Sequence, residues 1–253
     1  MTNIFTINNF LKEILDPNNM SDIAINGIQV ENDGNEIKKI AFAVDASFAA
    51  MEKAIKEGCS LLITHHGIFW GKVEPVTGII KKRLKLMLEN NLGLISYHLP
   101  LDAHPEYGNN AQILKKLGII NMQPFGKYKG NLIGFKGECE KPITIENICD
   151  KLGVILNKNN VSYLGFGKKE IKKIGVVSGG ASDNVYDAIE EKLDLFITGE
   201  SSHEIYHTAL ENNINVLFAG HYHTETFGIK AIQNKIEEEF KIYTIFCDIP
   251  TGL

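Results

Sequence analysis

The chain has 253 residues, of which 44% are hydrophobic and 23% are charged, and its formal net charge is -5 at pH 7. This length is sufficient for about one to two domains of ~150 residues, and the composition excludes a disordered chain, a collagen-like repeat and a disulfide-dense mini-protein. The acidic balance disfavours broad nucleic-acid binding, because that binding requires a cationic face.

Short apolar runs alternate with amphipathic segments along the chain, which is typical of successive β-α-β units. In chain order, the predicted strands are residues 39–44, 60–64, 92–97, 174–177, 193–198, 214–219 and 242–246. The predicted helices are residues 48–57, 78–90, 111–117, 145–152, 182–192, 202–212 and 226–240. Most strands are continuous apolar runs, as expected for strands buried on both faces. We therefore predict an α/β fold with mostly parallel sheets covered by helices.

The composition changes between residues 123 and 173, where Gly and Lys are scattered among short apolar runs. This change indicates the passage into a second domain. We predict a discontinuous first α/β domain formed by residues 1–124 and 222–253, and a second α/β domain formed by residues 125–221.

The cysteines are far apart and include no C-x-x-C pair, which indicates buried thiols in a reducing compartment: Cys59, Cys139, Cys149 and Cys247. The first residues lack a basic segment followed by an apolar one, and no apolar run approaches the ~18 residues of a membrane span. We therefore expect a cytoplasmic protein without a membrane partner.

Six of the eight histidines lie just after three predicted strands: His65 and His66, His98 and His104, and His221 and His223. The carboxyl ends of parallel strands meet at one edge of a sheet, so we expect these side chains to converge. Imidazole and carboxylate groups are the natural ligands of borderline divalent metals. The pattern therefore predicts a metal site at the strand ends.

The donor set favours two ions rather than one. Gly67 allows the chain to turn, so His65 and His66 can approach one centre from two sides just past their strand. His221 and Glu225 are four residues apart and share a helix face, and Asp102 lies in a loop stiffened by a proline. Three histidines and two carboxylates exceed one tetrahedral site but fit two ions if Asp102 or Glu225 bridges them. Zinc, iron, manganese and nickel all suit such ligands.

Several sequence blocks resemble one known family: residues 26–31 (NGIQVE), 64–70 (THHGIFW), 96–102 (SYHLPLD), 178–181 (SGGA), 198–200 (TGE) and 220–225 (GHYHTE). The chain resembles the GTP cyclohydrolase I type 2-like family, also called the Nif-three-like family. The resemblance implies two interlinked α/β domains with the metal site in the cleft between them. It also implies a dinuclear centre on His65, His66, Asp102, His221 and Glu225, and a toroidal homohexamer.

The function implied by this resemblance is that of a dinuclear metal-binding protein, and we predict a metal-dependent hydrolase. Its substrate would be a nucleotide or a related phosphorylated heterocycle, with His98 as a proton shuttle or as a hydrogen-bond partner outside the metal ligands. One alternative is a metal chaperone or metal-delivery protein, which needs the same ligands but no turnover. A further alternative is a ring-shaped regulatory or nucleic-acid-associated protein, with lysines such as Lys168 and Lys169 lining its hole.

Other polar motifs compete with the strand-end site. His203-Glu204-Ile205-Tyr206-His207 satisfies the H-E-x-x-H pattern of zinc proteases, but the pattern is short and no further protease motif follows it. Residues 178–182 (SGGAS) link a strand to a helix and are interpreted as a tight turn rather than a phosphate loop. The basic segment 81–85 is interpreted as a solvated helix face. Asp45, His104, Glu200 and His223 keep no assigned role.

Overall fold

The computed structural model describes residues 1–156 and 161–253, and the chain divides into two compact units. Unit 1 consists of residues 1–101 and 229–249, and unit 2 consists of residues 102–228 and 250–253. Residues 102–124 thus belong to unit 2, whereas the sequence groups them with the first domain. The domain division at residues 124 and 222 stays a prediction.

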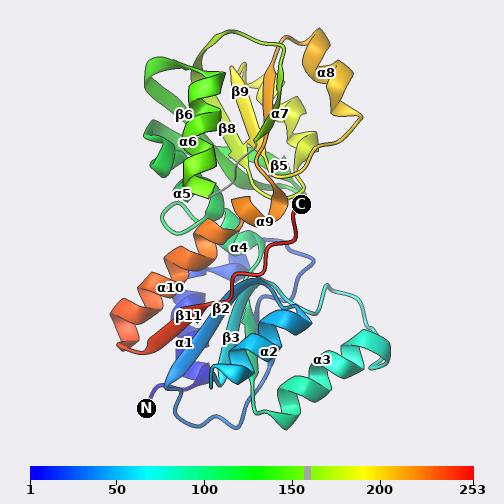
Figure 1. Ribbon diagram of the computed structural model, residues 1–253, viewed down its shortest axis with the longest axis vertical. Helices are drawn as coiled ribbons and strands as arrows, with labels where there is room; N and C mark the ends of the chain where they lie inside the picture. The colour runs from blue at the N-terminus through cyan, green and yellow to red at the C-terminus, as the bar shows by residue number, and fades with distance from the viewer. Residues whose placement is uncertain (157–160) are drawn as a thin grey trace. The chain divides into compact units, whose positions relative to one another are not determined.

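Unit 1 contains a five-stranded sheet in the order β1-β4-β3-β2-β11, of which β3, β2 and β11 are labelled in Figure 1. Its strands are β1 (Gly27–Val30), β2 (Lys39–Asp45), β3 (Leu61–His66), β4 (Gly93–Ser96) and β11 (Tyr243–Phe246). The pairings among β11, β2, β3 and β4 are parallel, and only the edge strand β1 pairs antiparallel. The carboxyl ends of β2, β3 and β4 therefore lie at one edge of this sheet.

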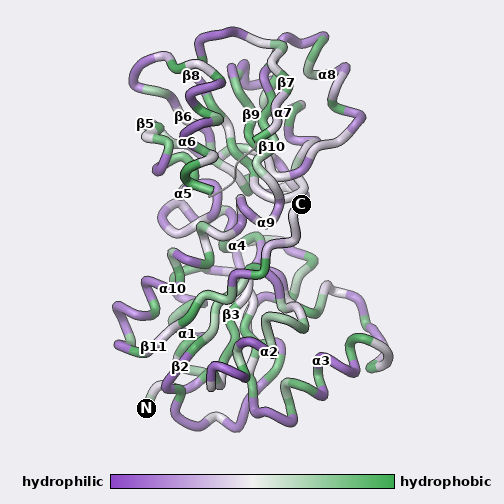
Figure 2. The backbone as a smooth tube through the Cα atoms, viewed as in Figure 1, coloured by the Kyte–Doolittle hydropathy of each residue, from purple (hydrophilic) through white to green (hydrophobic). Residues whose placement is uncertain are grey.

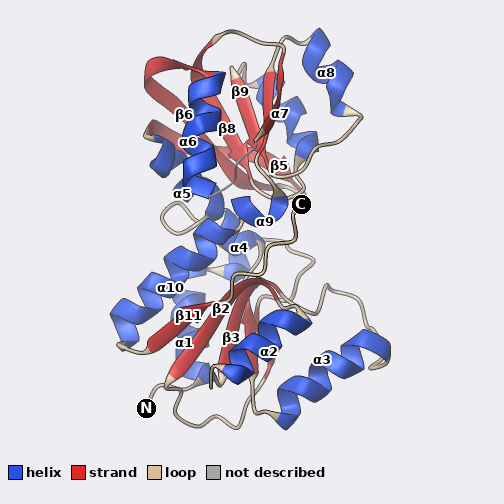
Figure 3. Ribbon diagram, viewed as in Figure 1, coloured by secondary structure: helices blue, strands red, loops and turns tan. Residues whose placement is uncertain are grey.

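Helices cover both faces of the unit 1 sheet (Figure 3): α1 (Ile4–Leu15), α2 (Phe48–Lys56), α3 (Gly78–Glu89) and residues 229–240 of α10 (Thr226–Phe240). The face formed by Ala41, Ala43 and Leu62 packs in one core cluster with residues of α2 and α3. Strand side chains alternate between faces, so the buried Ile40 and Phe42 face the other side. On that side α1 and α10 meet through Phe10 and Phe240, whose ring centroids are 5.2 Å apart.

Unit 2 contains a six-stranded sheet in the order β5-β6-β8-β9-β10-β7. Its strands are β5 (Ile119–Tyr128), β6 (Asn131–Thr144), β7 (Ser162–Gly165), β8 (Glu170–Val177), β9 (Leu195–Thr198) and β10 (Asn215–Phe218). Only β8, β9 and β10 pair in parallel, while β5, β6 and β7 add antiparallel pairings. This sheet is therefore mixed, rather than mostly parallel as the sequence predicts.

The helices of unit 2 also lie on both faces of its sheet (Figure 1): α5 (Asn109–Leu117), α6 (Ile145–Leu156), α7 (Val185–Glu190) and α8 (Ile205–Glu211). Apolar residues of α5 and α6 form one buried cluster with the sheet residues Val176, Leu195 and Ile197. This packing explains why α5 belongs to unit 2. Figure 2 shows hydrophobic residues concentrated in central strands such as β3 and β9, as the sequence predicts for strands buried on both faces.

Short helical segments complete the chain: the 3₁₀ turns η1 (Pro17–Asn19) and η2 (Ser182–Asn184), and the one-turn helices α4 (Leu99–Asp102) and α9 (His221–Thr224). The helix predicted at residues 182–192 is thus divided into η2 and α7, and the one predicted at 202–212 begins only at Ile205. Among the described residues, none of the helices combines the length and apolar character needed to cross a membrane.

Candidate metal centre

Three histidines gather at the carboxyl ends of the parallel strands of unit 1. His65 and His66 end β3, and His98 follows β4. Each of the three rings offers a nitrogen, and these atoms all lie within 4.8 Å of one another. We call these three residues the imidazole cluster. The ring centroids of His65 and His66 are 4.6 Å apart, and those of His65 and His98 are 5.2 Å apart.

The two adjacent histidines lie within the strand, whereas the sequence predicts them just past its end. β3 continues to His66 because this residue still pairs in register with Asp45 of β2. A regular strand would direct neighbouring side chains to opposite faces, yet both rings reach the same cluster at the strand terminus. His65 is fully buried there, whereas His66 and His98 are partly exposed.

Hydrogen bonds at Nδ1 determine the tautomer of each imidazole. The Nδ1 atom of His65 lies 3.0 Å from the carbonyl oxygen of Tyr97, which can only accept, so His65 donates. Nδ1 of His66 lies 2.8 Å from Oδ1 of Asp45, and Nδ1 of His98 lies 3.0 Å from Oδ1 of Asp22. With the Nδ1–H group donating to oxygen, the ring lone pair is on Nε2. Metal-binding histidines are oriented in this way.

Asp22 is a residue of this site that the sequence analysis missed. Its carboxylate accepts hydrogen bonds from His98 and from the backbone N–H groups of Ala24 and Leu99, each at 3.0 Å. Burial opposes its ionisation, but the hydrogen bonds from His98, Ala24 and Asn26 contribute to outweighing this effect and lower the pKa of Asp22. Asp22 lies in a loop without periodic pattern, and its only sequence signal is its closeness to the NGIQVE block.

Gln29 orders the loop that follows the two adjacent histidines. Its Oε1 atom accepts hydrogen bonds from the backbone N–H of Ile68 at 2.7 Å and of Phe69 at 3.3 Å. A Cβ atom at Gly67 would collide with the end of the Gln29 side chain, which would have to move away from the position in which it accepts these hydrogen bonds. The loop then places the Trp70 ring centroid 5.2 Å from that of His98. The indole therefore forms an apolar wall beside the imidazole cluster.

In unit 2, a histidine lies between two carboxylates. His221 begins α9, directly after β10, and its Nε2 atom lies 3.1 Å from Oε2 of Glu225. Its Nδ1 atom lies 2.5 Å from Oε1 of Glu200, which follows β9. Burial disfavours the charged imidazole, but Glu225 and Glu200 outweigh burial and raise the pKa of His221 to about 9. The close approach of His221 and Glu225 confirms that they share a face, although α9 is separate from α10.

Asp102 is held at the end of α4 by two side-chain donors. Its Oδ1 atom accepts hydrogen bonds from Nδ2 of Asn109 at 2.9 Å and from Oγ of Ser178 at 3.0 Å. The carboxyl group is buried, and only 5% of the residue is exposed. Gly179, the next residue of the turn after β8, lies directly against the Glu225 carboxylate. The SGGA turn thus contacts both predicted carboxylate ligands of unit 2.

The remaining polar motifs have structural explanations. Nδ1 of His104 accepts hydrogen bonds from the backbone N–H groups of Glu106 and Tyr107. α8 begins at Ile205, so His203 and Glu204 of the H-E-x-x-H pattern precede the helix. Within the described ranges, neither His203 nor His207 belongs to a group of three or more side chains that could hold a metal ion. Asp45 and Glu200, which had no predicted role, contact His66 and His221.

The five predicted ligands divide between the two units. His65 and His66 lie in unit 1 beside His98, whereas Asp102, His221 and Glu225 lie in unit 2. Histidines gather at the strand ends of unit 1, and a histidine lies beside carboxylates in unit 2; this donor chemistry suits a divalent metal ion. The number of ions and the sharing of ligands stay predictions.

The fold and these side chains define a class: an α/β protein of two sheets with histidine and carboxylate groups at the strand ends. The Duf34/NIF3 (NGG1p interacting factor 3) family model matches residues 2–251, and the chain belongs to this family. The chain is 42% identical over 251 residues to the "GTP cyclohydrolase 1 type 2 homolog" of Archaeoglobus fulgidus, covering 99% of this chain and 100% of that protein.

A second relative with the same description, from Pyrococcus abyssi, is 46% identical to this chain over 244 residues. The matched region covers 96% of this chain and 97% of that protein. Among solved structures, TTHA1606 from Thermus thermophilus is similar with a TM-score of 0.91 and 33% sequence identity. That similarity covers 100% of both chains. Both the resemblance predicted from the motifs and the α/β fold are therefore confirmed.

Proposed function

We propose that this protein binds two divalent metal ions and is a metal-dependent hydrolase acting on a nucleotide or a related phosphorylated heterocycle. The proposed ligands are His65, His66, Asp102, His221 and Glu225. The observation that carries the proposal is the imidazole cluster, in which each Nδ1–H group is directed to an oxygen acceptor and each Nε2 carries the lone pair. The names of the relatives support the choice of a cyclohydrolase-like substrate.

The residues of unit 2 also fit a metal ion. The buried carboxylate of Glu225 lies 3.1 Å from Nε2 of His221, so a carboxylate oxygen and an imidazole nitrogen that could both bind a cation face each other. Glu200 lies at Nδ1 of His221, on the other side of the ring from Glu225. A hydrogen bond at this nitrogen orients a metal-binding imidazole. Asp102 keeps its orientation through Asn109 and Ser178. A buried carboxylate requires compensation by hydrogen bonds or cations, and the buried Asp102 and Glu225 have such surroundings.

The chemistry of the site follows from these groups. Divalent ions held there would lower the pKa of a bound water and polarise an oxygen of the substrate. His98 holds a proton at Nδ1 toward the ionised Asp22, so its Nε2 can accept a proton from the substrate or from water. Trp70 covers this side of the imidazole cluster with an apolar ring and limits its contact with water. His98 is therefore proposed as the proton shuttle.

Elemental analysis of the untagged protein tests the metal assignment. We expect about two transition-metal ions per chain, lost in Asp102→Ala and kept in His203→Ala, which is the matched control from the H-E-x-x-H pattern. Asp102→Ala or Glu225→Ala should disturb both ions if that carboxylate bridges, whereas loss of one histidine should mainly weaken one. Equal loss of a single ion in all five ligand variants would contradict bridging.

Turnover distinguishes the hydrolase from a metal-delivery protein. The metal-loaded protein should convert a guanine or related nucleotide, and His98→Gln should lower kcat by about 100-fold or more while metal content stays unchanged. Weak, exchangeable metal without turnover on any nucleotide would instead favour metal delivery. We also propose a homohexameric ring, which light scattering after size-exclusion chromatography would measure. A monomer would contradict the ring.

A further inference from the structure

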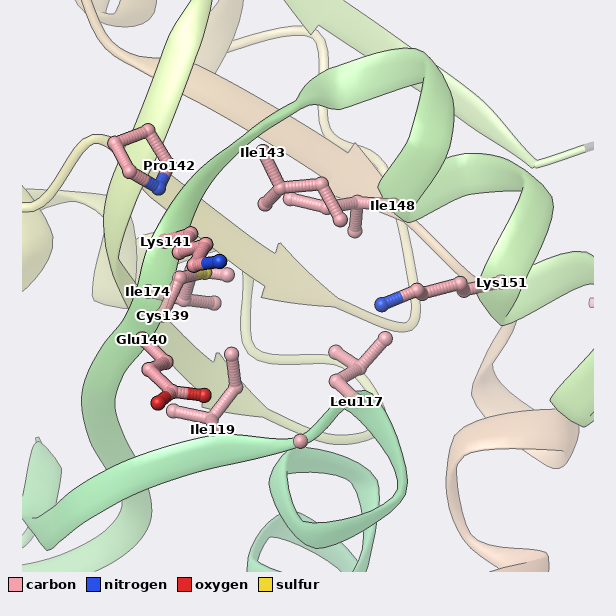
Figure 4. A pocket seen from close by; sticks show the side chains of 11 residues that line it. Leu117, Ile119, Cys139, Glu140, Lys141, Pro142, Ile143, Ile148, Lys151 and Ile174 are labelled. Carbon is pink, nitrogen blue, oxygen red and sulfur yellow. The ribbon is translucent and has the colours of Figure 1, made fainter.

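Unit 2 contains a cavity of about 410 Å³ where strand β6 separates from β8 (Figure 4). Glu138 of β6 pairs with Lys173 of β8, but the next pair joins Ile143 with Ile171. β6 therefore advances five residues while β8 advances two, and residues 139–142 bulge out of the ladder. We call the resulting space the bulge cavity. None of the proposed metal ligands lines it.

The floor of the bulge cavity is apolar. Leu117 at the end of α5, Ile119 of β5, Ile148 of α6 and Ile174 of β8 line the cavity, and all four also belong to the buried core cluster of unit 2. Ile143 from the bulged strand adds a further apolar side chain. Polar and charged groups make up much of the remaining lining, and cavities of this size that combine apolar side chains with convergent polar groups can bind small molecules.

Two ammonium groups point into the bulge cavity from different elements. Lys141 extends from the bulge of β6 and Lys151 from α6, and Figure 4 shows both nitrogen atoms directed into the space between them. Neither lysine takes part in a salt bridge with any carboxylate of residues 1–156 and 161–253.

The charges of the bulge cavity match a single negative charge. Among the described residues of its lining, Glu140 is the one carboxylate, and the two lysines therefore leave a net charge of +1. A ligand with one anionic group would neutralise the site, whereas a nucleotide would bring several charges onto an apolar floor. A carboxylate between two ammonium groups accepts charge-assisted hydrogen bonds, which are the strong ones.

We propose that the bulge cavity binds a small carboxylic acid with an apolar body. Its carboxylate lies between Lys141 and Lys151, and its body lies against Ile119, Ile148 and Ile174. This site goes beyond the proposed metal-dependent function, and it is separate from the metal site because none of the proposed metal ligands lines the cavity. Failure of the metal proposal would leave this one intact.

Isoleucine methyl groups allow a local test on the full chain, because the cavity is lined by Ile119, Ile143, Ile148 and Ile174. With ¹³C-labelled isoleucine δ1 methyl groups, 4-phenylbutanoate should shift these four resonances and leave that of Ile205 in α8 unchanged. The neutral 4-phenylbutanamide should bind at least about tenfold more weakly, since it lacks the charge. Equal binding of acid and amide would overturn the assignment of an anionic ligand.

Lysine variants complete the test. Lys141→Gln and Lys151→Gln should each weaken 4-phenylbutanoate binding by about tenfold, and the double variant should reduce its affinity to that of the amide. Lys169→Gln, an exposed lysine outside the cavity lining, is the matched control and should bind as the parent protein does. Unchanged affinity in the double variant, absence of shifts at the four methyl groups, or tighter binding of guanosine monophosphate at the same methyl groups would overturn the proposal.

Discussion

The imidazole Nδ1 of His66 lies 2.8 Å from the carboxylate of Asp45, and the two residues pair in register at the ends of the adjacent parallel strands β3 and β2. The sheet register itself thus creates a carboxylate–histidine pair. Such a pair keeps the imidazole in one tautomer and orientation, and it makes Nε2 a more basic metal ligand.

Loss of this carboxylate should weaken metal binding without unfolding the protein. Asp45→Ala removes the acceptor at Nδ1 of His66, and we expect the metal affinity to fall by about 10- to 100-fold. Asp45→Asn keeps an acceptor oxygen and should lose less. Competition with a chromophoric chelator measures both affinities. An affinity in Asp45→Ala equal to that of the parent protein would show that the pair does not orient a ligand.

Gln29 should control the order of the loop from Gly67 to Trp70. Its Oε1 atom accepts two backbone N–H groups, so Gln29→Ala leaves them without this partner and should cost about 1–3 kcal/mol in the free energy of unfolding. Gln29→Glu retains an acceptor and is the matched control. Urea unfolding measures the stability, and Trp70 fluorescence reports the loop. Identical unfolding curves for Gln29→Ala and the parent protein would refute this role.

Gly179 should be required for the position of Glu225. Its φ of +68° is strained for other residues, and a Cβ atom there would collide with Oε1 of Glu225. We expect Gly179→Ala to lower stability by about 1–2 kcal/mol and also to reduce the bound metal. Gly130→Ala is the matched control, because Gly130 has a φ of +86° and its Cβ would meet nothing within 4 Å.

The two glycine variants separate backbone strain from the site. Both should show a lower Tm in calorimetry, but only Gly179→Ala should lose metal in elemental analysis. Equal metal content in both variants would show that the turn does not hold the Glu225 carboxylate.

Asp194 should make the stability of unit 2 dependent on pH. Burial opposes its ionisation, but Nζ of Lys168 at 2.7 Å and the backbone N–H groups of Lys173 and Lys172 outweigh burial. The pKa of Asp194 therefore lies below its ordinary value of 3.8. A carboxyl group with a depressed folded pKa stabilises the fold above its unfolded pKa, and this contribution is lost as the pH falls through the folded value.

The corresponding variant is Asp194→Ala, which should lose about 2 kcal/mol of unfolding free energy at pH 7. The difference from the parent protein should shrink as the pH is lowered below 3.8, because the carboxyl group then binds a proton in the unfolded chain before it does so in the folded protein. Urea titrations from pH 7 to pH 3 measure this difference. A difference that stays constant over the whole range would exclude the ionised carboxylate as its cause.

The core elements of this protein could be predicted because their signals are local. Continuous apolar runs indicated β2, β3, β4, β9 and β10, and the spacing of Ile229, Ile232 and Ile236 indicated α10. The antiparallel strands β5 and β6 were missed because register shifts interrupt their alternation of buried and exposed residues. α1 was missed although Asn3 caps it and Ile4, Ile7 and Leu11 form a buried stripe, so that signal was present in the sequence.

The histidine and carboxylate residues of the candidate site follow apolar segments that predict strands. Their position at the strand ends could therefore be predicted from the sequence alone. Their hydrogen-bond partners are not visible there, because Asp22 and His98 are 76 residues apart and meet only through the packing of loops. The bulge cavity depends in the same way on pairing between β6 and β8. The residue types and the succession of apolar segments can be read from the sequence. Tautomers, ionisation states and cavities depend on groups that tertiary packing brings within a few ångströms of one another.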